Sequence, residues 1–82
     1  MAVCLLADLQ QGQWGVVQSV HLPEGQRRRL EDLGLVPGTR ICCGYLAPSG
    51  SPMAFWIKGT LIALRKEDCS EIVLERGDRY EN

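Results

Sequence analysis

Residues 28–39, RRLEDLGLVPGT, decide how this chain folds. Helix-forming residues without β-branched side chains fill residues 24–33, and Gly34 follows at the place of a C-cap glycine. Pro37 and Gly38 then fit the two central positions of a type II turn, because proline presets φ at the first and glycine tolerates positive φ at the second. The stretch predicts a short helix, a sharp reversal and the start of a strand.

The expected helix has an apolar side and a basic side. Leu30 and Leu33 are three residues apart and share one face, which we expect to plug an open end of the fold. Arg27, Arg28 and Arg29 span most of a turn, so they cannot all face the core. Such a cluster is either a solvated helix face, the commoner role, or a charged surface for a partner.

Short alternating runs lie on either side of this stretch and are separated by turn signals. They cover residues 16–20, 40–47, 53–57, 61–64 and 72–74. Alternation of apolar and polar residues predicts strands. Five short strands with tight turns and one helix across an end predict a mainly β small barrel or sandwich. A second helical turn is expected at residues 66–69.

Strand alternation also predicts which side chains face outward. Ile41, Cys43 and Tyr45 are expected on one side of their strand. Phe55 belongs to the apolar set of the next strand, so its neighbour Trp56 is expected on the outer face. An outward tryptophan is either an interface residue or a cover for the end of the barrel.

Composition excludes several classes of protein. The chain has 82 residues, nine Lys and Arg against ten Asp and Glu, and a net charge of −1. One small domain is expected, over residues 1–76, with a frayed tail at residues 77–82. A near-neutral balance argues against a general nucleic-acid binder. No apolar run reaches the roughly 18 residues of a membrane span, and no signal peptide is evident, so we expect an intracellular protein.

The sequence offers little chemistry. The cysteines, Cys4, Cys42, Cys43 and Cys69, have no C-x-x-C spacing, and we expect reduced thiols that act as small apolar fillers. There is no Gly-rich phosphate loop and no paired His and carboxylate cluster, so the chain is not expected to be an enzyme. The nearest set of metal-ligating residues, His21, Glu24, Asp68 and Cys69, comes from separate segments without diagnostic spacing.

The stretch at residues 28–39 resembles the signature of the FeoA family, small cytosolic accessory proteins of the bacterial ferrous-iron transport system. In that family a leucine-bearing helix runs into a D-[LM]-G-[LMF]-x-P-G-[TA] turn. Three more blocks are similar in order: LQQG at residues 9–12, APSGSP at 47–52 and GTLIALR at 59–65. The resemblance covers roughly residues 5–75. The structural signature residues are Gly12, Leu30, Leu33, Gly34, Pro37, Gly38, Thr39, Pro48 and Gly59.

This resemblance implies a fold and a partner. The fold is a small SH3-like five-stranded barrel with one short helix across an end, also seen as the C-terminal module of DtxR-type iron-dependent repressors. The partner is FeoB, a membrane protein that couples a cytoplasmic GTP-binding domain to ferrous-iron passage. The resemblance implies a cytoplasmic protein recruited to the membrane by its partner, without inserting itself and without a required cofactor. We expect it to bind through Arg27, Arg28, Arg29 and Trp56.

Other interpretations stay open. A transition-metal-binding or iron-sensing module would bind a divalent ion weakly, with His21, Glu24, Asp68 and Cys69 as the nearest ligands. A nucleic-acid module is less favoured, because basic residues are sparse on the expected strands. An open sheet edge favours a homo-oligomer, whereas a charged edge would keep the chain monomeric.

Overall fold

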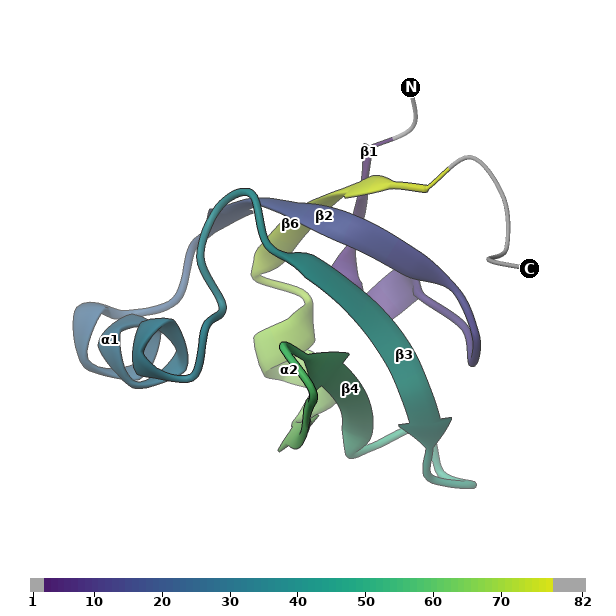
Figure 1. Cartoon of the computed structure of the whole chain (residues 1–82). Coiled ribbons are helices and arrows are strands. Elements are labelled where there is room, and N and C mark those ends of the chain that lie inside the picture. Colours follow the sequence, from purple (N-terminus) through teal and green to yellow (C-terminus); the bar gives the residue numbers. More distant parts are fainter. Residues whose placement is uncertain (1–2, 78–82) are drawn as a thin grey trace.

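The computed structural model describes residues 3–77 and shows a curved, six-stranded antiparallel sheet with short helices (Figure 1). In chain order the elements are β1 (Val3–Leu5), the 3₁₀ turn η1 (Leu6–Asp8), β2 (Trp14–Val20), α1 (Glu24–Asp32), β3 (Arg40–Leu46), β4 (Met53–Ile57), β5 (Thr60–Leu64), α2 (Lys66–Cys69) and β6 (Ile72–Arg76). The strand order is β1-β6-β2-β3-β4-β5, so β1 and β5 are the two edges of the sheet. Figure 1 shows α1 at one side of the sheet, within the connection from β2 to β3.

The predicted mainly β fold with one short helix is confirmed, and the structure adds a sixth strand. β1 was not predicted because it is only three residues long and is followed directly by η1. So short a strand has too few residues to show an alternation of apolar and polar side chains. The expected helical turn at residues 66–69 is present as α2. The frayed tail predicted for residues 77–82 lies outside the described residues, except for Gly77.

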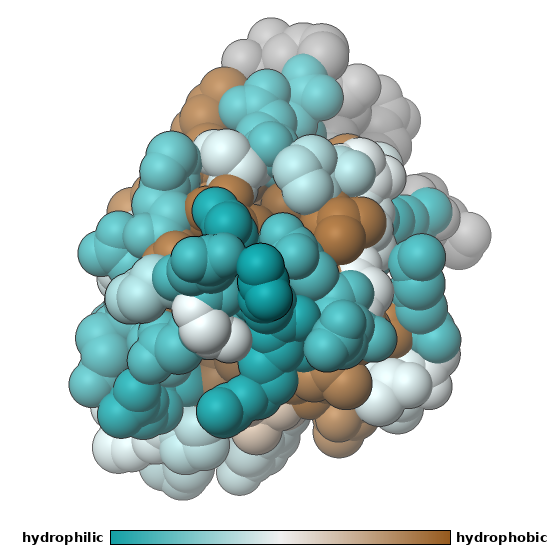
Figure 2. All heavy atoms as spheres, turned by 90° about the vertical axis from the view of Figure 1, so that its left-hand side faces the viewer, coloured by the Kyte–Doolittle hydropathy of each residue, from teal (hydrophilic) through white to brown (hydrophobic). Residues whose placement is uncertain are grey.

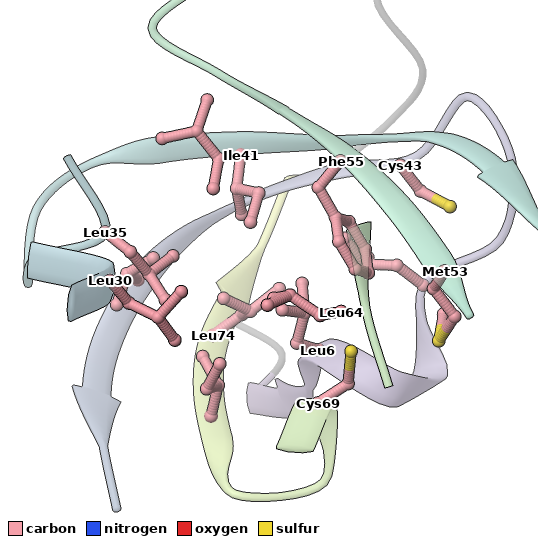
Figure 3. Packing of buried hydrophobic residues seen from close by; sticks show 14 of the residues in the cluster. Leu6, Leu30, Leu35, Ile41, Cys43, Met53, Phe55, Leu64, Cys69 and Leu74 are labelled. Atoms are coloured by element: carbon pink, nitrogen blue, oxygen red, sulfur yellow. The ribbon is translucent and has the colours of Figure 1, made fainter. Parts of the chain in front are cut away.

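The end of α1 is fixed by a pair of backbone hydrogen bonds around Gly34. The Gly34 N–H donates to the Glu31 carbonyl at 2.9 Å, and the Leu35 N–H donates to the Leu30 carbonyl at 2.9 Å. This is the Schellman pattern, in which the residue after the cap adopts left-handed backbone, and Gly34 has φ of +102°. The pattern places Leu30 and Leu35 in one apolar cluster (Figure 3).

Leu30 is buried as predicted, but the prediction that Leu33 helps to plug the core was wrong. Leu33 is 44% exposed, whereas Leu35 is fully buried. A three-residue spacing predicts a shared face only while the helix continues, and Leu33 is already the C-cap. The reversal at Gly34 brings Leu35 to the core in place of Leu33.

The expected type II turn follows α1 and is hydrogen-bonded to β2. The Thr39 N–H donates to the Val36 carbonyl at 3.0 Å, and Gly38 has φ of +94°, as the turn after Pro37 requires. The Gly38 N–H donates to the Val17 carbonyl at 2.8 Å, and the Val17 N–H donates to the Thr39 carbonyl at 2.9 Å. Helix, turn and sheet are thereby joined at one place.

A register shift in β3 reverses the direction that was predicted for one side chain. Ile41 and Cys43 are buried as expected, but Tyr45 is exposed, so its assignment to their face was wrong. The pairing of β3 with β4 is irregular between Cys43 and Tyr45. A bulge adds one residue to the strand and inverts the alternation beyond it. Leu46 consequently packs against the core.

Gly34→Ala should lower the free energy of unfolding by about 1–2 kcal/mol, because alanine pays a steric cost at positive φ. An alanine Cβ would also lie 3.0 Å from Lys58 Cδ. The matched control is Gly25→Ala, inside α1 and with no atom within 4 Å of the added Cβ, which should raise stability by up to about 1 kcal/mol. Urea unfolding followed by circular dichroism measures both, and effects of equal sign would contradict the prediction.

Candidate functional site

An exposed apolar surface covers the outer face of β3, β4 and β5. Trp56 lies opposite Cys42 on one side and Leu61 on the other, and opposed residues of antiparallel strands share a face. Tyr45 lies opposite Ala54, which is two residues from Trp56 and therefore on the same face. Tyr45, Trp56 and Leu61 are 53%, 48% and 49% exposed. We call these three residues the outer patch.

Gly44 allows Trp56 to lie close against β3. A Cβ at Gly44 would be 2.7 Å from Trp56 Nε1 and 3.3 Å from Leu61 Cδ1, so any side chain there would displace the indole. The glycine thus sets the position of the central residue of the outer patch.

Two cations border the outer patch. A hollow of about 490 Å³ beside Trp56 is lined also by Gly38, Thr39, Arg40, Cys42 and Lys58. The Arg40 guanidinium lies over the Trp14 ring, 4.1 Å from its centroid, which is a cation–π geometry. The patch therefore combines aromatic area with positive charge at its rim.

The three arginines of α1 differ in their surroundings. Arg28 Nη2 lies 3.0 Å from Glu24 Oε2, and Arg27 Nε lies 3.6 Å from Glu31 Oε2, each pair four residues apart on the helix. No ion pair of Arg29 is found within residues 3–77. Exposed pairs of this kind contribute little to stability. Figure 2 shows the face that carries α1 as largely hydrophilic, with apolar patches at its borders.

Of the three α1 arginines only Arg29 lines a hollow, and that hollow is separate from the one beside Trp56. The end of α1 approaches the outer patch through Lys58, whose side chain lies next to Gly34 and also lines the hollow beside Trp56. Arg29 instead lines a groove of about 360 Å³ between α1 and β5. The two hollows share no lining residue.

The candidate metal ligands are not gathered into one site. They are His21, Glu24, Asp68 and Cys69, and Glu24 and Asp68 each pair with an arginine, at 3.0 and 3.2 Å. His21 Nε2 lies 2.8 Å from Ser19 Oγ. Over residues 3–77, no group of three or more His, Cys, Asp or Glu is placed to hold a metal ion. Cys69 is fully buried, and burial raises the pKa of its thiol to about 12, helped by the charge of Asp68.

Only one member of the outer patch was predicted from the sequence. The outward Trp56 was predicted, but its partners Leu61 and Tyr45 were not. The two-residue turn Lys58-Gly59, visible in the sequence, would have placed Leu61 opposite Trp56. Tyr45 had no such signal, because a bulge determines its direction.

Comparison with known proteins gives matches of sequence and of structure. Residues 4–76 match the sequence model of the FeoA domain. The solution structure of a FeoA protein from Chlorobium tepidum is 33% identical, with a TM-score of 0.86 over 89% of this chain and 70% of that one. The crystal structure of Stenotrophomonas maltophilia FeoA, a prokaryotic SH3 domain protein complexed with zinc, is 29% identical, with a TM-score of 0.76 over 88% of this chain and 89% of that one. The predicted SH3-like fold is thus confirmed.

The predicted likeness to repressor modules is confirmed at the level of the fold. The IdeR structure from T. acidophilum has a TM-score of 0.80 at 14% identity, over 94% of this chain and 35% of that one. The search of curated proteins gave no match. No helix within the described part of the chain has the length and apolarity to cross a membrane.

Gly44→Ala should move Trp56 away from β3 and shift its fluorescence emission to longer wavelength, because the added Cβ would lie 2.7 Å from Nε1. We expect a stability loss below about 1 kcal/mol, since the indole is half exposed and can swing outward. Both proteins are compared in a Trp14→Phe background, so that Trp56 alone reports. An unchanged emission maximum would contradict the packing described.

The Cys69 thiol should make stability fall with pH in the alkaline range. Its folded pKa is raised from 9.0 to about 12, so the native state keeps a proton that the unfolded chain releases. The free energy of unfolding should be unaffected by this thiol below about pH 9 and then fall by up to about 1.4 kcal/mol per pH unit up to about pH 12. Urea unfolding from about pH 8 to about pH 10 checks this. Cys69→Ala should show a shallower slope, and identical slopes would contradict the assignment.

Proposed function

This chain belongs to the FeoA family, non-catalytic accessory proteins of ferrous-iron transport, and from that premise we propose that it regulates iron uptake by binding the transporter FeoB. The binding takes place in the cytoplasm, where FeoB presents its GTP-binding domain, and it recruits the chain to the inner face of the membrane. The chain contributes recognition, and the transporter contributes GTP hydrolysis.

The outer patch is the observation that supports binding. Tryptophan, tyrosine and arginine are the residues that most often carry the binding energy of an interface. Trp56 is half exposed, packs over Gly44 and has Leu61 beside it, so it presents a supported apolar surface to a partner. Arg40 and Lys58 at its border favour a partner surface with negative charge.

A weak divalent-metal site is the second candidate function. The S. maltophilia relative forms a complex with zinc, and this property of the relative is the observation that favours a metal site here. In this chain the four candidate ligands have other partners or are buried, so we propose that binding to FeoB requires no resident metal. Capture of FeoB that is lost on chelation and restored by a divalent ion would contradict this.

Trp56→Ala should weaken binding to FeoB by at least about tenfold, as expected for truncation of an interface anchor. The measurement is capture of detergent-solubilised FeoB by the tagged chain, with and without a GTP analogue. Val3→Ala is the control, because Val3 is an exposed apolar residue on the opposite edge strand β1. No capture by the wild type in any nucleotide state would contradict the proposed function, whereas equal capture by Trp56→Ala would contradict only the role of the outer patch.

A further inference from the structure

β5 presents an open edge to solvent. It pairs with β4, and no other strand within residues 3–77 lies on its far side. The two-residue turn sets Ile57 opposite Thr60 as the closing pair of the hairpin. Since hydrogen-bonded and non-hydrogen-bonded pairs alternate from there, the backbone N–H and C=O groups of Leu61 and Ala63 point away from β4.

The sequence and pairing of this edge lack the features that usually hinder strand addition. Edge strands are commonly short, charged or interrupted by proline or a bulge. β5 has the sequence TLIAL, without charge or proline, and its pairing with β4 is regular over all five residues. The opposite edge, β1, is only three residues long. β5 is therefore the edge that is ready to accept another strand.

The space beside β5 suits the side chains of an added strand. The groove between α1 and β5 has a volume of about 360 Å³, and its apolar lining includes Leu22, Leu30, Leu33, Ile62 and Leu64. Alternate side chains of a strand point to opposite faces. A strand added to β5 would direct one set into this groove and the other set onto the outer face beside Leu61, next to the outer patch.

The charge at the groove selects the kind of segment. Arg29, Arg65 and Asp68 line it, and Asp68 pairs with Arg65 at 3.2 Å, which leaves Arg29 as the unneutralised charge among these three. Arg27 and Arg28 are paired on α1, whereas Arg29 has no ion pair within the described residues. A carboxylate on the incoming segment would meet the exposed Arg29 side chain at the side of the groove, and this opposite charge favours one segment over another.

We propose that an extended peptide segment of a partner protein, apolar at alternate positions and carrying a carboxylate that meets Arg29, binds as an additional strand on β5. A second copy of this chain is the poorer occupant, because residues 60–64 supply no carboxylate for Arg29. This inference rests on the proposed function for the source of the segment, which is a cytoplasmic part of FeoB.

The backbone test uses one position with two substitutions. Ala63→Pro removes an N–H that faces the open edge, and proline is tolerated on edge strands where that N–H faces solvent. It should weaken capture of FeoB about tenfold, as the loss of a backbone hydrogen bond and a steric block to pairing predict. Ala63→Val keeps the N–H and should bind within about twofold of the wild type. Circular dichroism establishes that both variants are folded.

The charge test compares two neighbouring arginines. Arg29→Glu should weaken binding about tenfold, whereas Arg28→Glu, on a side chain that pairs with Glu24 outside the groove, should have a much smaller effect. Equal effects of the two reversals would overturn the role of the groove.

Amide hydrogen exchange on the wild type gives a readout that requires no variant to fold. On binding FeoB, exchange at Leu61 and Ala63 should slow by at least about tenfold. Capture of FeoB with unchanged exchange at these amides would overturn the β5 proposal and leave the proposed function intact. Failure of the wild type to capture FeoB would overturn both. Concentration-dependent dimerisation that Ala63→Pro abolishes would assign β5 to a second copy and overturn the proposal.

Discussion

The left-handed backbone at Gly34 is the constraint on which the arrangement of this protein depends. The two hydrogen bonds around it end α1 and place Leu35 in the core together with Leu30. The turn at Pro37 and Gly38 follows immediately and is bonded to Val17 of β2, so the helix has little freedom relative to the sheet. This attachment places α1 across the groove from β5 and brings its C-terminal end next to Lys58 of the β4–β5 turn.

β5 connects the three surfaces on which the proposals rest. Its inward side chains, Ile62 and Leu64, line the groove, Leu61 belongs to the outer patch, and its backbone forms an open edge. A short chain uses most of its apolar residues to build one core. A partner must therefore be recognised by the faces and edges of the sheet that lie outside the core. Backbone pairing at the edge supplies affinity, and the side chains on either side supply specificity.

Two predictions assumed that a local pattern continues, and they failed where a bulge or the end of the helix interrupts it. The outward direction of Trp56 was predicted correctly because β4 is regular. Tyr45 was assigned to the wrong face because a bulge in β3 inverts the alternation, and Leu33 was assigned to the core although the helix ends there. His21, Glu24, Asp68 and Cys69 could be named as candidate ligands from the sequence, but long-range packing determines whether they meet, and within residues 3–77 they form no metal site.

The mainly β fold, the helix with its glycine cap, the type II turn and the family could all be predicted from the sequence, because each depends on local backbone preferences or on motif order. The sixth strand, the direction of Tyr45 and the open edge at β5 depend instead on the tertiary structure. These features arise from pairings between residues that are distant in sequence, such as β1 with β6, and from a bulge whose position depends on the neighbouring strand. The local propensity of a segment does not indicate which distant strand it will pair with.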